Sequence, residues 1–175
     1  MAKGIDSDVD CTATAQLIKG AGYDFVGRYY RMPSPYSGKT PLKRSEAAAL
    51  TTQGLSIVSI WEYISGSRNR IETLTYETGK DEGKRAYSQA LAVPQTAGTP
   101  IYFCVDEGYD PDEPSYAGPI EAYFKGVNEA FAEAAGQGQE PAYKIGVYGP
   151  GAVCKWLQQK GREPISNLLS GVDRL

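Results

Sequence analysis

Short apolar stretches rich in β-branched and aromatic residues alternate with helix-like stretches along the whole sequence. The predicted strands cover residues 4–6, 25–30, 56–62, 101–106 and 144–149. The predicted helices cover residues 11–20, 42–53, 77–92, 120–135 and 152–160. Apolar strands that alternate with helices are typical of a parallel sheet covered by helices. The pattern therefore predicts an α/β fold, and it leaves open a doubly wound sheet and a (β/α) barrel.

The 175 residues are predicted to form a single domain, because no linker-like change in composition divides them. A complete eight-stranded (β/α) barrel usually takes about 200 to 250 residues. Residues 162–175 contain no convincing strand and are predicted to be an atypical tail. We therefore expect a barrel truncated after about five or six βα units. Its uncovered strand edges would favour self-association.

The composition excludes several classes of function. Histidine is absent, which removes Ser-His-Asp and Cys-His catalysis and histidine-ligated zinc. A net charge of −3 provides no basic field for nucleic acid. The acidic run at residues 106–113 lacks the spacing of an EF-hand loop, and no Gly-rich nucleotide-binding motif follows a strand. We therefore expect no nucleic-acid partner, no metal and no cofactor.

The predicted compartment follows from the cysteines and from the start of the sequence. The three cysteines are an odd number at wide spacing, which predicts reduced thiols. The first residues contain no apolar signal segment, and no apolar run reaches the length of a membrane span, about 18 residues. We therefore expect a protein that is made in the cytoplasm.

Acids and aromatic residues stand at the predicted carboxyl ends of the strands, where the βα loops of a parallel fold meet. The candidates for catalysis are Asp6, Glu62, Asp106 and Glu107, and the candidates for substrate binding are Arg28, Tyr30, Trp61 and Tyr148. Glycosidic cleavage needs two carboxyl groups several ångströms apart, one of them as the general acid. Aromatic rings suit the apolar faces of sugars. The pattern therefore favours a site for carbohydrate.

The acids also have structural interpretations. Asp6, Asp8 and Asp10 all precede a predicted helix and could cap it. Asp106 is the best single candidate for the site, because an acid directly after the apolar run IYFCV is costly to place unless it is used or paired.

Two further alternatives concern the second and third strands. Glu62 could form a salt bridge with Arg28 instead of serving a site. Strand alternation lets only one of Tyr29 and Tyr30 face the interior of the barrel.

Six motifs, in this order, resemble the bacterial glycoside-hydrolase-like domain known as domain of unknown function 1906. They are GIDSDVD, AGYDFVGRYY, LKRSEAAALTTQGLSIVSIWEY, IYFCVDEGYD, YFKGVNEAF and YKIGVYGPGAVCKWL. The resemblance implies a TIM barrel related to the family 25 lysozymes. It also implies a glycosidase-type protein that acts on or binds cell-wall polysaccharide. Within that site, the resemblance makes Asp6 the acid of the first strand and Asp106 the acid of the fourth.

The sequence departs from the related lysozymes on the fourth strand. Those proteins carry Asp-x-Glu, which points both acids to the same side of a strand. Here Gly108 takes the place of the glutamate, and alternation would turn the displaced Glu107 away from the barrel axis. The proton donor is therefore either Glu107 or Glu62.

The resemblance leads to a hypothesis of a peptidoglycan hydrolase of the lysozyme or muramidase type. The alternatives are a non-catalytic carbohydrate or cell-wall binding module and an inactive truncated member of the family. Either kind of protein would reach the wall by a phage-lysis or secretion-system route.

Overall fold

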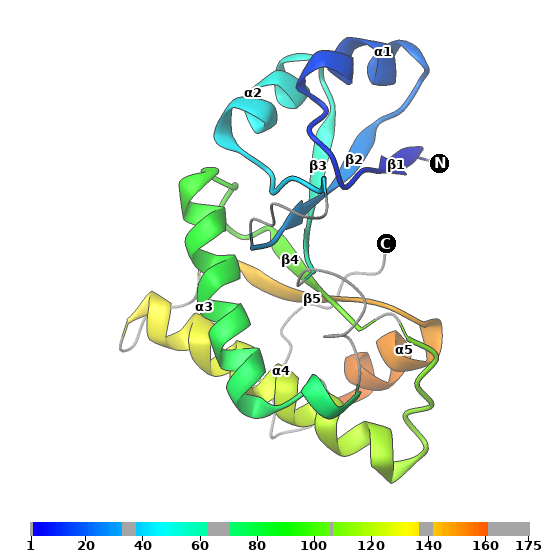
Figure 1. Cartoon of the computed structure of the whole chain (residues 1–175), viewed down its shortest axis with the longest axis vertical. Coiled ribbons are helices and arrows are strands. Elements are labelled where there is room, and N and C mark those ends of the chain that lie inside the picture. The colour runs from blue at the N-terminus through cyan, green and yellow to red at the C-terminus, as the bar shows by residue number, and fades with distance from the viewer. Residues whose placement is uncertain (1, 33–37, 63–70, 106, 137–141, 161–175) are drawn as a thin grey trace.

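The computed structural model describes residues 2–32, 38–62, 71–105, 107–136 and 142–160. Its strands are β1 (Gly4–Asp6), β2 (Phe25–Tyr30), β3 (Ser56–Trp61), β4 (Pro100–Cys104) and β5 (Lys144–Tyr148). Its α-helices are α1 (Ala15–Gly20), α2 (Arg44–Thr52), α3 (Tyr76–Ala92), α4 (Pro114–Ala135) and α5 (Gly151–Lys160), with short 3-10 turns at Thr12–Thr14 and Ile71–Thr73. The predicted alternation of strands and helices is confirmed (Figure 1).

The five strands form one parallel sheet in the order β1-β2-β3-β4-β5. In the register of its centre, Tyr30 lies opposite Trp61, and Trp61 lies opposite Phe103. A doubly wound sheet reverses its strand order at a switch point, whereas a (β/α) barrel adds its strands consecutively. The observed order therefore selects the barrel arrangement.

The helices cover one face of this sheet. Val26 and Tyr30 are four residues apart on β2 and therefore point to the same side. Val26 packs in a cluster with residues of α1 and α2, and Tyr30 packs in a cluster with residues of α3, α4 and α5. The opposite face carries a separate cluster of Tyr29, Ile60 and Tyr102. That second face corresponds to the interior of a barrel.

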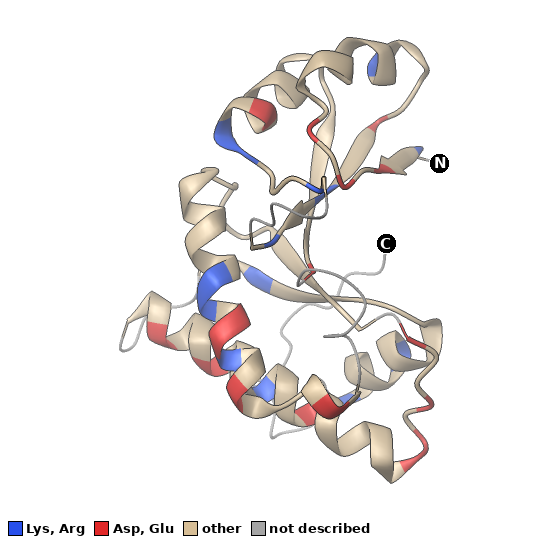
Figure 2. Cartoon of the chain, viewed as in Figure 1, with Lys and Arg blue, Asp and Glu red and all other residues tan. Residues whose placement is uncertain are grey.

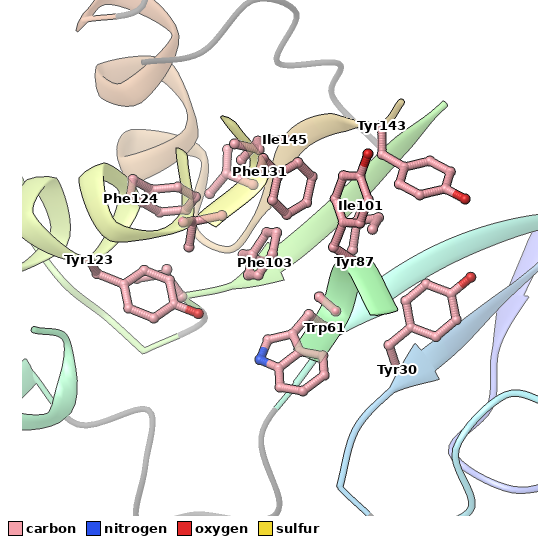
Figure 3. Close-up of a cluster of buried hydrophobic side chains, with 14 of the residues drawn as sticks. Tyr30, Trp61, Tyr87, Ile101, Phe103, Tyr123, Phe124, Phe131, Tyr143 and Ile145 are labelled. Carbon is pink, nitrogen blue, oxygen red and sulfur yellow. The ribbon is translucent and has the colours of Figure 1, made fainter. Parts of the chain in front are cut away.

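Aromatic rings hold α3 and α4 against the sheet (Figure 3). The ring of Phe103 on β4 lies 6.0 Å from that of Phe131 and 6.4 Å from that of Tyr123, both on α4. Tyr87 of α3 meets Phe131 edge to face, with centroids 5.1 Å apart. Such tilted pairs are the favoured geometry for aromatic rings. They add directional contacts to the burial of apolar surface.

Glycines allow the backbones of α3 and α4 to touch where the two helices cross. A Cβ atom on Gly126 would lie 2.1 Å from the carbonyl oxygen of Tyr76. A Cβ atom on Gly79 would lie 2.0 Å from the carbonyl oxygen of Tyr123. Because no side chain fits at either point, the crossing requires glycine.

Ion pairs flank this crossing on the outer surface, where Figure 2 shows the charged residues of α3 and α4. Lys80 lies 2.7 Å from Glu133, and Lys84 lies 2.8 Å from the same carboxylate. Their hydrogen bonds lower the pKa of Glu133 to about 2. Among the helices that the structure describes, none combines the length and apolar character needed to cross a membrane.

Replacing Gly126 by alanine is expected to destabilise the protein by about 1–3 kcal/mol or more, because the helices must move apart. Gly118 lies on the same helix, and a Cβ atom there would meet nothing within 4 Å. Gly118→Ala is therefore the matched control, expected to leave the free energy of unfolding unchanged or raise it by up to about 1 kcal/mol. Urea denaturation of both variants measures the difference. Equal losses would contradict the close crossing.

A fully buried ion pair joins β2 to α2. Arg28 donates from Nε to Glu46 Oε1 (2.6 Å) and from Nη2 to Glu46 Oε2 (2.9 Å), and both side chains have 0% exposure. The guanidinium also donates to the carbonyl oxygens of Ser7 (2.7 Å) and Thr40 (3.1 Å). The backbone amide of Cys11 donates to Glu46 Oε1 (2.8 Å). The pair therefore connects four segments of the chain.

We expect Arg28→Met to lower the free energy of unfolding by about 3–5 kcal/mol, because it leaves Glu46 charged and buried without its partner. Arg85→Met is the control, since Arg85 forms an exposed pair with Asp81 one turn away on α3. Loss of that pair should cost at most about 0.5 kcal/mol. Chemical denaturation compares the two variants. A small loss for Arg28→Met would show that the buried pair does not hold these segments.

Candidate functional site

The carboxyl ends of β1, β2 and β3 surround a pocket of about 310 Å³. Asp6, Ser7, Asp8, Tyr29, Lys39 and Glu62 line it. Asp6 ends β1, Tyr29 belongs to β2, and Glu62 directly follows β3. This is the edge at which parallel α/β folds place their functional residues. The structure therefore brings two of the four predicted acids, Asp6 and Glu62, into one pocket.

Asp6 accepts a hydrogen bond from Tyr29 on the neighbouring strand. The Tyr29 hydroxyl lies 2.6 Å from Asp6 Oδ2. Burial, and then the hydrogen bond to Asp6, raise the pKa of Tyr29 far above its ordinary value. The phenol therefore stays protonated at neutral pH and remains a donor to the carboxylate.

Glu62 forms an ion pair with Arg31. Arg31 Nη2 lies 2.9 Å from Glu62 Oε2, and the exposed fractions of the side chains are 1% and 19%. The guanidinium carbon lies 4.4 Å from the centre of the Tyr29 ring, a cation–π arrangement. Gln89 of α3 holds the Arg31 main chain with two hydrogen bonds of 3.0 Å. The salt bridge considered for Glu62 exists, but its partner is Arg31 and not Arg28.

The two other acids after β1, Asp8 and Asp10, have partners of their own. Asp10 accepts from the Thr12 amide (2.8 Å) at the start of the first 3-10 turn. Hydrogen bonds from the Thr12 side chain and main chain lower the pKa of Asp10. Asp8 lies 3.4 Å from Lys39 at the side of the pocket. Of the three aspartates considered as caps, Asp10 bonds to the first residue of this turn, whose N-cap position is Cys11, and Asp6 bonds to the sheet.

Arg28, Tyr30 and Trp61, which were named from the sequence for sugar binding, lie buried on the helix-covered face of the sheet and do not line the pocket of Asp6 and Glu62. Their exposed fractions are 0%, 0% and 1%. The physical reason is the period of two along a strand, which turns alternate side chains to opposite faces. Tyr29, rather than Tyr30, therefore faces the pocket.

The partners of the two aromatic residues explain their burial. The Tyr30 hydroxyl donates to Gln95 Oε1 at 3.0 Å, and burial raises the pKa of Tyr30 to about 12. Trp61 Nε1 donates to Glu82 Oε2 at 2.9 Å, and the Tyr123 hydroxyl donates to the same oxygen at 2.6 Å. Trp61 therefore provides one of the hydrogen bonds to the buried carboxylate of Glu82 on α3.

The remaining predicted residues lie beyond β4 and on β5. Tyr148 ends β5, is half-buried and packs against the cluster of the inner face. Asp106 lies outside the described residues. β4 ends at Cys104, so strand alternation does not set the direction of Glu107. Glu107 is exposed, and its carbonyl oxygen accepts from the Tyr109 amide at 2.7 Å.

Sequence reasoning left open which of Tyr29 and Tyr30 faces the interior, and it missed Arg31 and Lys39. A signal for Tyr29 and Arg31 exists. Residues two apart in a strand point to the same side, and residues 29 and 31 lie two apart at the end of a predicted strand. Lys39 lies between β2 and α2, and no pattern indicates it. Within the described ranges, no group of three or more acids and cysteines is placed to hold a metal ion.

A larger pocket of about 510 Å³ lies on the other side of the sheet, lined by residues of α2, β3 and the segment 93–100. Its described lining carries no acidic or basic side chain. Of these two pockets, only the smaller one is lined by acids.

A consecutive parallel sheet, helices on one face and acids at the carboxyl ends of the strands define a barrel-type, glycoside-hydrolase-like protein. The chain belongs to the Rv2525c-like, glycoside hydrolase-like domain family, whose family model matches residues 16–173. The predicted family and its TIM-barrel-like fold are therefore confirmed. Membership supports a glycosidase-like or carbohydrate-binding role.

One solved structure with this fold is that of the Tat-secreted protein Rv2525c of Mycobacterium tuberculosis in complex with HEPES. The TM-score is 0.66 at 23% identity, over 89% of this chain and 72% of that one. Its complex with L-tartrate gives a TM-score of 0.65 at 24% identity, with the same two coverages.

Two uncharacterized proteins of Bacillus subtilis (strain 168) are also similar. FadG is 31% identical over 147 residues, and YbfG is 34% identical over 157 residues. Each match covers 84% of this chain but only 24% of FadG and 20% of YbfG. The chain thus spans about a quarter or less of the length of these relatives.

Trp61→Phe tests the structural role of the indole. We expect a loss of about 1–3 kcal/mol in stability, because buried Glu82 loses a donor. Binding of glycan by the folded protein should not change. Trp156→Phe is the control, because Trp156 is only partly buried at the edge of the core. Thermal unfolding and a glycan-binding assay measure both effects, and a selective loss of binding in Trp61→Phe would contradict the assignment.

Proposed function

We propose that the chain is a glycoside-hydrolase-like protein that acts on cell-wall polysaccharide, with peptidoglycan as its substrate. The observation that carries the proposal is one pocket that presents the carboxylates of Asp6 and Glu62 beside the Tyr29 hydroxyl. Glycosidic cleavage uses paired carboxyl groups around the bond. Carboxylates and hydroxyls also form hydrogen bonds with sugar hydroxyls. Family membership supports carbohydrate as the class of ligand.

The contacts of the two acids suggest a division of roles. In this proposal Asp6 is the carboxylate that stabilises positive charge at the anomeric carbon, and Asp106 is the second acid beside the bond. The carboxylate of Glu62 is already engaged in the ion pair with Arg31. Proton donation is therefore assigned to Glu107 rather than to Glu62.

A second candidate is a binding module without catalysis. One observation favours it. Asp6 and Glu62 have partners that suit a charged carboxylate, the Tyr29 hydroxyl and the Arg31 guanidinium. A general acid instead needs surroundings that favour its protonated form. Such a module would bind the same glycan through the same pocket.

Rv2525c is a Tat-secreted protein, which supports a site of action outside the cytoplasm for this domain too. Peptidoglycan is located there. We therefore propose that the chain meets its substrate at the wall after secretion or cell lysis.

Purified peptidoglycan sacculi provide the test. The wild-type protein is expected to sediment with sacculi and to release muropeptides, and Asp6→Asn should reduce release by about 100-fold or more. Asp24→Asn makes the same change of charge at the amino end of β2, where Asp24 lies 3.9 Å from Lys19, and should change neither activity.

The outcomes separate the two candidates. Sedimentation of the wild type without release would favour the binding module. Absence of both sedimentation and release would refute a role at peptidoglycan.

A further inference from the structure

We infer that Tyr29 and Arg31 are positioning residues that hold Asp6 and Glu62 as one coupled pair of carboxylates for the glycan. The inference rests on the proposed function of the pocket and adds two residues to it. The contacts form a continuous chain from Asp6 through Tyr29 and Arg31 to Glu62.

The first link is the bond between Tyr29 and Asp6. Tyr29 is only 8% exposed, whereas the carboxylate that it holds is exposed at the pocket. The phenol packs with Ile60 and Tyr102 on the inner face, which restricts its movement. A buried ring thus supports an exposed acid and limits the directions in which its oxygens point.

The second link is the ion pair of Arg31, which differs from that of Arg28 three residues earlier. Arg28 has acceptors for its Nε and for both terminal nitrogens, and its partner Glu46 is buried. Arg31 Nε is buried and finds no acceptor in the part of the chain that the structure describes. Its partner Glu62 remains partly exposed. A buried donor without an acceptor destabilises the folded state. Proteins keep such unsatisfied groups mainly at functional sites.

The third link joins the two acids through one ring. The Arg31 guanidinium carbon lies 4.4 Å from the centre of the Tyr29 ring. A shift of Arg31 therefore moves the group that holds Asp6 as well as the group that pairs with Glu62. Among the residues that the structure describes, the other charged and titratable groups around these contacts are Asp8, Lys39 and Tyr148.

The adjacent tyrosines provide a matched pair of variants. Tyr29→Phe removes the hydroxyl that holds Asp6, and Tyr30→Phe removes a hydroxyl on the opposite face of the same strand. We expect Tyr29→Phe to weaken binding to sacculi about 5- to 10-fold, as expected for the loss of one hydrogen bond. Tyr30→Phe should leave the affinity at the wild-type value. Equal effects of the two substitutions on affinity would overturn the inference.

Arg31 is tested by partial rescue and by a spectroscopic signature without ligand. Arg31→Lys keeps the charge and should retain more affinity than Arg31→Met. In carboxyl carbon NMR of the free protein, Arg31→Met should shift the signals of both Glu62 and Asp6. Lys84→Met, which removes the ion pair with Glu133 between α3 and α4, should shift neither.

These measurements separate the inference from the proposed function. If the wild-type protein does not bind sacculi, the proposed function fails, and the NMR signals alone then decide the coupling. An unchanged Asp6 signal in Arg31→Met would overturn the coupling even if the wild type binds glycan.

Discussion

The burial of Arg28 against Glu46 is the interaction on which the amino-terminal half of the structure depends. Two charges can leave water only when their geometry is good and their remaining donors and acceptors are matched. Here the match requires β2, α2 and the carbonyl oxygens of Ser7 and Thr40 to be in place together. The segments that contain these carbonyl groups also supply residues of the pocket. The ion pair on one face therefore supports the shape of the polar pocket on the other.

A step of one residue along β2 separates the structural side chains from those of the pocket. Arg28 and Tyr30 point to the helices, whereas Tyr29 and Arg31 belong to the inner face and its rim. Both sets contain an arginine and a tyrosine, so residue type does not distinguish them. What distinguishes them is the partner, which is a buried acid for Arg28 and an acid at the pocket for Arg31.

Periodicity predicted the strands and helices well because each element buries one face. It placed the start of α4 too late, at Ile120, whereas the helix begins at Pro114 and contains Pro119. The faces of β2 were harder to predict, because Arg28 interrupts the apolar alternation. Glu46 is the residue that indicates which face of β2 carries Arg28, because the two side chains form an ion pair. It lies one turn before Leu50 on the same side of α2, which predicts that its carboxylate faces the sheet.

The consecutive order of the strands also has a consequence for folding. Each strand pairs with the one that precedes it in the chain, but a crossover helix separates the two, as in the pairing of Gly4 with Phe25 and of Pro100 with Lys144. Parallel strands paired across such crossovers form slowly, and chains begin to fold from the amino terminus during synthesis. During translation, β2 can therefore pair with β1 before β3 leaves the ribosome. The bond from Tyr30 to Gln95 spans 65 residues and closes only after α3 has emerged.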